Sequence, residues 1–101
     1  MEVASSKRNV PIRLSTDGWA HIVEHHEDLA GYRDHVLEAI EDPDAIVRGK
    51  SGELLALKSM TDRTLVVAYR ETSREDGFVI TAFFTTQPDR IQKRGLVWQK
   101  R

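Results

Sequence analysis

The chain has 101 residues, of which 40% are hydrophobic, enough for one modest core and so for one domain. It contains no cysteine, which excludes disulfides, thiolate nucleophiles and cysteine-ligated zinc. The net charge of −1 argues against non-specific nucleic-acid binding as the main task, although the more basic second half leaves room for one phosphate-bearing ligand.

The beginning of the chain is polar and offers neither a signal peptide nor a membrane span. We expect residues 1–9 to form a disordered tail and residues 10–101 to form a single domain. The lack of cysteine fits a reducing interior, so we expect a cytoplasmic protein without membrane contact.

One strand and two helices are predicted at the start of this domain. Val10, Ile12 and Leu14 alternate with polar residues, which predicts a short strand. Ser15 or Thr16 then caps a helix over about residues 16–26. Its apolar face holds Trp19, Ile22, Val23 and His26. The same spacing predicts a second helix over about residues 29–40, which ends before Pro43 because the residue preceding a proline disfavours helical geometry.

After Pro43 the hydrophobic period changes from near four to two, which predicts strands. We expect them at Ala45–Arg48, Leu54–Met60, Thr64–Arg70, Phe78–Thr86 and, after a loop with Pro88 and Gly95, at Leu96–Gln99. Their short connectors join antiparallel neighbours. The predicted fold is therefore α+β, with two N-terminal helices packed on one face of a four- to five-stranded antiparallel meander.

The longest predicted strand has two different faces. We expect Phe78, Ile80, Ala82 and Phe84 to meet the helices. The other face carries Val79, Thr81, Phe83 and Thr85. Because helices cover only one side of the predicted sheet, this second face is expected to be open to a ligand.

Three of the four histidines lie between residues 21 and 26, and imidazole is the side chain whose ordinary pKa lies nearest neutral pH. His21, Glu24 and His25 match the H-x-x-E-H pattern of zinc proteases. Such a site needs a third protein ligand, so we expect an exposed His21, no metal and no other cofactor.

The other histidines also have non-catalytic alternatives. His26 lies on the apolar face, and its alternative role is that of a hydrogen-bonded core residue. His25 lies off that face with simple solvation as its alternative, and His35 is expected at the surface.

Further polar candidates lie on adjacent predicted strands: Lys58, Tyr69, Arg70, Thr81, Thr85 and Thr86. An imidazole, a fixed cation and a hydroxyl together supply what metal-free RNA cleavage needs. A base takes the 2′-OH proton, an acid protonates the leaving 5′-oxygen, and a cation holds the charge on phosphorus. The alternative is that the cations are solvated and that the threonines reflect β-propensity.

Three strings occur in the order of a known family: Trp19-x-x-Ile22 with His25 and Glu27, then Glu41-Asp42-Pro43-Asp44-x-Ile46, then Asp76-Gly77-Phe78-Val79-Ile80-Thr81-Ala82-Phe83. Over about residues 12–99 the chain resembles the phage-associated group of barnase/EndoU/colicin/RelE-like (BECR) nucleases. The resemblance implies helices packed on a four-stranded antiparallel sheet and a metal-independent RNase of phage or toxin–antitoxin settings.

Carried over residue by residue, the histidine of the family pattern falls on His25 and its threonine on Thr81. Thr85 is the next hydroxyl on the same face, and Arg70 and Lys58 are candidates for the phosphate-binding cation, with Tyr69 beside them. The family pattern usually has proline after the histidine, whereas this chain has His26. Both imidazoles therefore remain candidates.

The resemblance also implies partners. RNA is the expected substrate, and an antitoxin or immunity protein is a possible second partner. The alternative function is a non-catalytic BECR-fold interaction module, or a RelE-like inhibitor of translation. The sequence does not specify the oligomeric state, the RNA target or the cleavage specificity.

Overall fold

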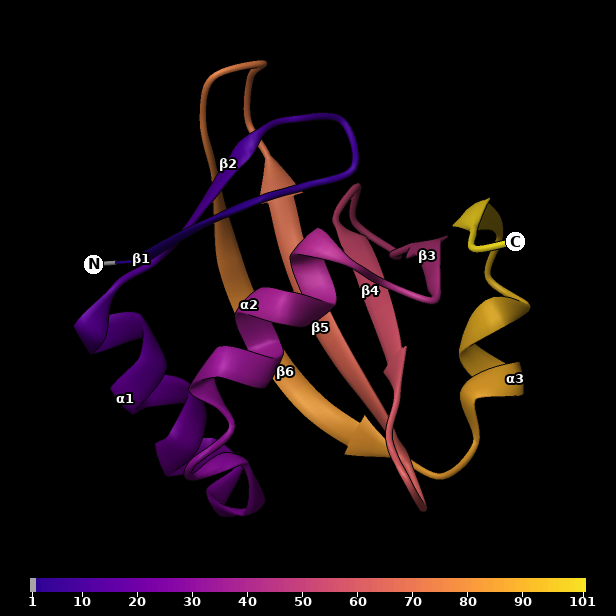
Figure 1. The fold of residues 1–101 in the computed structure, drawn as a ribbon, viewed down its shortest axis with the longest axis horizontal. Helices are drawn as coiled ribbons and strands as arrows, with labels where there is room; N and C mark the ends of the chain where they lie inside the picture. Colours follow the sequence, from indigo (N-terminus) through magenta and orange to yellow (C-terminus); the bar gives the residue numbers. More distant parts are fainter. Residues whose placement is uncertain (1) are drawn as a thin grey trace.

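The protein is built around one seven-stranded mixed sheet, seen here in a computed structural model that describes residues 2–101 (Figure 1). The strands are β1 (Glu2–Ser5), β2 (Pro11–Leu14), β3 (Ala45–Arg48), β4 (Leu54–Ser59), β5 (Thr64–Glu71), β6 (Gly77–Thr85) and β7 (Leu96–Gln99). The helices are α1 (Thr16–His25), α2 (Arg33–Glu41) and α3 (Pro88–Gln92), with a 3-10 turn η1 (Glu27–Leu29) after α1. The order across the sheet is β1-β2-β6-β5-β4-β3-β7.

The predicted architecture of a four- to five-stranded antiparallel meander is wrong. Strands β3, β4, β5 and β6 are antiparallel neighbours, but β2 joins the sheet parallel to β6. Strand β1 pairs with β2, and β7 pairs with β3 at the other edge. Alternation along a strand predicts that the strand exists, whereas its partner depends on residues far away in the chain.

Strand β1 lies where the sequence predicts a disordered tail. Its residues pair with β2 from Glu2 opposite Leu14 to Ser5 opposite Pro11. Ala4 is fully buried, and the Glu2 carboxylate forms an ion pair with Arg33 of α2. The start of the chain is therefore part of the sheet, held by burial and by backbone hydrogen bonds that a polar composition does not reveal.

Helices α1 and α2 lie on one side of the sheet, where Figure 1 shows α2 crossing β5. The Ser15 hydroxyl caps α1 by accepting a hydrogen bond from the Gly18 N–H at 2.9 Å. Helix α1 ends at His25, because the backbone dihedrals of His26 are not helical. The core on this side combines Ile22, Leu29, Val36, Ala39 and Ile40 with Ile12, Leu14, Leu65, Val67 and Tyr69 of the strands. We call this side the helix side.

The opposite side of the sheet has a smaller apolar cluster. It consists of Ala45, Val47, Leu55, Leu57, Val66 and Ala68 with Ile91 of α3. Helix α3 forms where the sequence predicts only a loop, and Pro88 stands in its first turn, a position that proline favours. We call this side the far side, because α1 and α2 lie across the sheet from it.

A bulge between β5 and β6 changes which β6 side chains face the helices. Ala68 pairs with Thr81 and Tyr69 with Val79, so Ile80 is an extra residue. Val79 and Phe84 pack on the helix-side core. Phe78 is instead on the far side, because its neighbour Val79 belongs to the helix side and successive strand residues alternate. The expectation that Phe78 and Ile80 meet the helices is therefore wrong, and Ile80 is 39% exposed.

No helix within residues 2–101 is both long enough and apolar enough to cross a membrane.

Candidate functional site

The sheet separates the predicted site residues into two groups. The far side carries Thr81, Thr85 and Arg70. Each of them is next in its strand to a residue of the helix-side core, and successive residues of a strand point to opposite sides of the sheet. Lys58 and Tyr69 belong to the helix side. Of the two predicted cations, Arg70 therefore shares a side of the sheet with Thr81 and Thr85, whereas Lys58 does not.

The ammonium group of Lys58 in β4 is paired with groups in α2 and at its C-terminal end. Its ammonium donates to the Asp42 carbonyl oxygen at 2.7 Å and to Asp42 Oδ2 at 3.1 Å, and it lies 3.6 Å from Glu38. Partial burial lowers the pKa of Lys58, but the hydrogen bond and the charge of Asp42, with Glu38 and Asp44, outweigh burial and raise it. This cation ties β4 to the end of α2.

Tyr69 of β5 is buried in the helix-side core. Burial raises the pKa of its phenol, and the negative charge of Glu71 raises it further against the weaker opposing effect of Arg8. The phenol is therefore neutral near physiological pH. Tyr69 also lines a cavity beneath the turn between β1 and β2. This cavity lies across the sheet from the threonines of the far side.

The two candidate histidines have different surroundings. The His25 ring is exposed and packs edge-on against the His21 ring, with centroids 4.4 Å apart. The His26 ring is half-buried and lies 6.3 Å from the Phe83 ring, with the two planes inclined by 34°. His26 therefore faces β6, as helical phase predicts, whereas the family pattern carries the role to His25. His35 is exposed and packs on Tyr32.

The threonines on β6 flank Phe83 on the far side. Thr81 is half-exposed opposite Ala68, and Thr85 is opposite Thr64. The Thr85 hydroxyl accepts a hydrogen bond from the Gln87 N–H at 3.1 Å and so shapes the turn into α3. Thr86, the remaining hydroxyl candidate, follows the end of β6 and is exposed. Thr81 is the hydroxyl best placed for a ligand on this face.

Two residues that the sequence did not single out for binding, Arg13 and Phe78, join Arg70 in a row across the far side. Phe78 pairs with Arg13 of β2 and with Arg70 of β5, so the three residues are neighbours across the far side. Arg70 donates to the Ser51 carbonyl oxygen at 3.1 Å. Only the pairing of β2 with β6 reveals this row, and no local pattern encodes that pairing.

Asp76 holds Arg13 in a two-pronged ion pair. Arg13 Nε lies 2.7 Å from Asp76 Oδ1, and Nη2 lies 3.0 Å from Oδ2. The hydrogen bond and charge of this pair raise the pKa of Arg13, and the Arg13 hydrogen bond lowers the pKa of Asp76. Arg13 is thereby oriented, but its charge is largely balanced, which leaves Arg70 as the stronger attraction for a phosphate in this row.

The H-x-x-E-H pattern of His21, Glu24 and His25 lies on helix α1, where the two imidazole rings pack against each other. Within residues 2–101 no group of three or more His, Asp or Glu side chains is arranged to hold a metal ion. The exposed His21–His25 pair is at one end of α1 and lacks a third ligand from another element, which a structural or catalytic zinc requires.

The chain matches no known protein family, no curated protein and no solved structure.

Proposed function

We propose that this protein is a metal-independent endoribonuclease that binds single-stranded RNA across the far side of the sheet. The observation that carries this proposal is the contact between His26 and Phe83. Phe83 stands between Thr81 and Thr85 on the far side, so an imidazole from the helical part meets the hydroxyl-bearing strand. His26, Thr81 and Arg70 are the proposed site, and Lys58, Tyr69 and His25 have no part in it.

Each of the three residues has a distinct role in the proposed reaction. His26 takes the proton from the 2′-OH, whose oxygen attacks the adjacent phosphorus. The bond from phosphorus to the 5′-oxygen breaks, water protonates that oxygen, and a 2′,3′-cyclic phosphate remains. Thr81 donates a hydrogen bond to a non-bridging oxygen, and Arg70 balances the growing negative charge. Phe78 stacks on a base beside the cleaved bond.

One observation favours the alternative of a non-catalytic interaction module with the same fold. Arg13 and Lys58 are both paired with carboxylates, and the charge of Arg70, which donates to the Ser51 carbonyl oxygen, helps to lower the pKa of Glu53. In that alternative His26 is a packing residue over Phe83, and the far side binds RNA or protein without cutting.

The test is incubation of the protein with total RNA in EDTA, beside His26→Ala, Thr81→Val and His25→Ala variants. His25→Ala is the matched control, because it removes the neighbouring imidazole on the exposed side. We expect His26→Ala to slow cleavage by about 10²–10⁴-fold, as loss of one proton-transfer group does. Thr81→Val should have a smaller effect and His25→Ala none.

Three results would count against the proposal. If folded wild-type protein does not cleave RNA but retains it on a filter, the module alternative is supported. If His25→Ala is inactive and His26→Ala is active, the imidazole assignment is wrong. If EDTA abolishes the cleavage, the reaction depends on a metal.

A further inference from the structure

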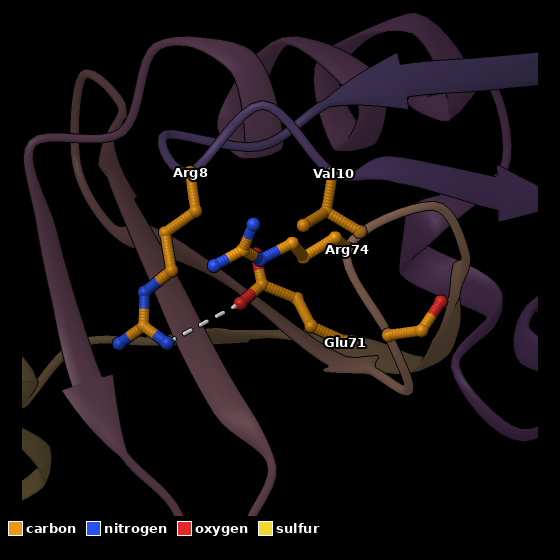
Figure 2. A pocket seen from close by; sticks show the side chains of 5 residues that line it. Arg8, Val10, Glu71 and Arg74 are labelled. Atoms are coloured by element: carbon orange, nitrogen blue, oxygen red, sulfur yellow. Dashed lines mark ion pairs between the residues drawn. The ribbon is translucent and has the colours of Figure 1, made fainter.

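Two neighbouring cavities lie beneath the turn that joins β1 to β2. The larger, about 550 Å³, is lined by Arg8, Val10, Glu71, Ser73 and Arg74 (Figure 2). The smaller, about 210 Å³, has Ile46, Leu54, Tyr69 and Trp98 in its walls, with Lys7 and Arg8. Arg8 is common to both cavities. Tyr69 and Glu71, two residues apart on β5, connect them along one face of the sheet.

The turn above these cavities is held by a buried polar network. The Ser6 N–H donates to the Val10 carbonyl oxygen at 2.9 Å, and the Asn9 N–H donates to the Ser6 carbonyl oxygen at 2.9 Å. Ser6 is buried, and its hydroxyl donates to Glu71 Oε2 at 2.6 Å while accepting from the Val10 N–H. Asn9 has a φ of 63°, a conformation that asparagine tolerates well. The cations at Lys7 and Arg8 are therefore presented by a rigid turn.

The larger cavity has an excess of positive charge. Arg8 Nη1 lies 3.6 Å from Glu71 Oε1, an ion pair longer than a hydrogen bond, so the guanidinium keeps donors for a ligand. Arg74, from the β5–β6 connection, lines the same cavity (Figure 2). Two guanidinium groups against one carboxylate favour a phosphate, whose oxygens match the planar guanidinium fork.

The smaller cavity has a different chemistry. Tyr69 and Trp98 provide aromatic walls, and Ile46 and Leu54 provide aliphatic ones. Lys7 Nζ lies 4.9 Å from the centre of the Trp98 ring, a cation–π contact at the rim. A planar heterocycle fits against Trp98, because aromatic side chains stack on the faces of bases, whereas Tyr69 is only 1% exposed and closes the cavity without stacking.

We propose that the two cavities together form a binding site for a nucleoside phosphate, with the base in the smaller cavity and the phosphate in the larger. The ligand is either a free mononucleotide or the phosphorylated 5′ end of an RNA strand, which share this chemistry. The site is on the helix side, across the sheet from the far-side row. It therefore stands whether or not the protein cleaves RNA.

The test is calorimetric titration of the full chain with AMP, adenosine and inorganic phosphate. AMP is expected to bind about tenfold or more tightly than adenosine or phosphate, because only AMP fills both cavities. Arg74→Gln should weaken AMP binding by about tenfold, the loss of one charge-assisted contact. The matched control is Arg90→Gln, an exposed arginine in α3, which should leave AMP binding unchanged.

A second variant and an RNA arm separate the remaining outcomes. Trp98→Leu should weaken AMP but not phosphate. In a His26→Ala background, a 5′-phosphorylated oligonucleotide that binds more tightly than the same oligonucleotide without the phosphate identifies an RNA end as the ligand, and equal binding of the two beside tight AMP binding identifies a free nucleotide. The proposal is overturned if folded protein binds none of these phosphates, or if Arg74→Gln and Arg90→Gln bind AMP equally.

Discussion

Arg70 and Tyr69, adjacent on β5, show how one position decides the role of a polar side chain. Arg70 is on the far side beside Phe78, whereas Tyr69 is buried under the helices. Lys58 has the charge that a phosphate site needs, yet its hydrogen bonds to Asp42 give it a structural role. Residue type predicted the chemistry of these side chains, and strand partners determined which of them share a surface.

The Arg13–Phe78–Arg70 row leads to a prediction about RNA affinity. Phe78→Ala should weaken binding of a single-stranded oligonucleotide by about 1–3 kcal/mol, which is the usual contribution of one base stacked on an aromatic ring. Filter binding with the His26→Ala protein, in which RNA cleavage should be slowed enough not to interfere, measures this loss.

The control for that experiment is Ile80→Ala, which removes an exposed apolar side chain from the same strand. Thermal unfolding of both variants checks that the sheet is intact. Equal RNA affinity of the two variants would show that Phe78 is not a stacking platform.

At the scale of elements, the local pattern predicted many of the boundaries. Strands 45–48 and 96–99 have the predicted ends, and α1 stops one residue before its predicted end. The bulge at Ile80 was not predictable, since alternation alone continues through it without a break. Helix α3 was missed because its five residues are too few for a helical period to appear in the sequence.

Gly77, where β2 meets β6, leads to a prediction about stability. A Cβ there would lie 2.5 Å from the Arg70 carbonyl oxygen and 2.6 Å from Ile12 Cδ1. Gly77→Ala should therefore lower the free energy of unfolding by about 1–3 kcal/mol, the usual cost of overpacking. Urea denaturation measures the change.

Adding Ile12→Val to Gly77→Ala separates the two clashes, because valine lacks the Cδ1 atom. The double variant should remain destabilised, since the Arg70 carbonyl belongs to the backbone and stays in place. A Gly77→Ala protein as stable as wild type would mean that β2 and β6 do not approach each other this closely.

At the scale of the whole molecule, the antiparallel run from β3 to β6 was within reach of sequence analysis because short turns join its strands. The pairing of β2 with β6 and of β7 with β3 was not, since these contacts join distant parts of the chain. The candidate site divides in the same way. Its residue types came from the sequence, while the Arg13–Phe78–Arg70 row and the cavities at Arg8 depend on the long-range pairing.

Strand β1 allows a direct test of this architecture with one substitution at two adjacent positions. Ala4 is 0% exposed and Val3 is 53% exposed. Ala4→Asp should lower the free energy of unfolding by about 2–4 kcal/mol, because it buries a charge without a partner. Val3→Asp should change it by less than about 0.5 kcal/mol, as surface substitutions do. Equal stability of the two variants in urea would mean that residues 2–5 are not packed in the sheet.

The parallel pairing of β2 with β6 also affects the order in which the chain folds during synthesis. Ile12 pairs with Gly77, so the first hairpin cannot dock until most of the polypeptide has been translated. Because the ribosome adds roughly 5–20 residues per second, the apolar side chains of this hairpin remain unpaired with β6 for several seconds. The β1–β2 hairpin therefore reaches its final position only after β6 has been synthesised.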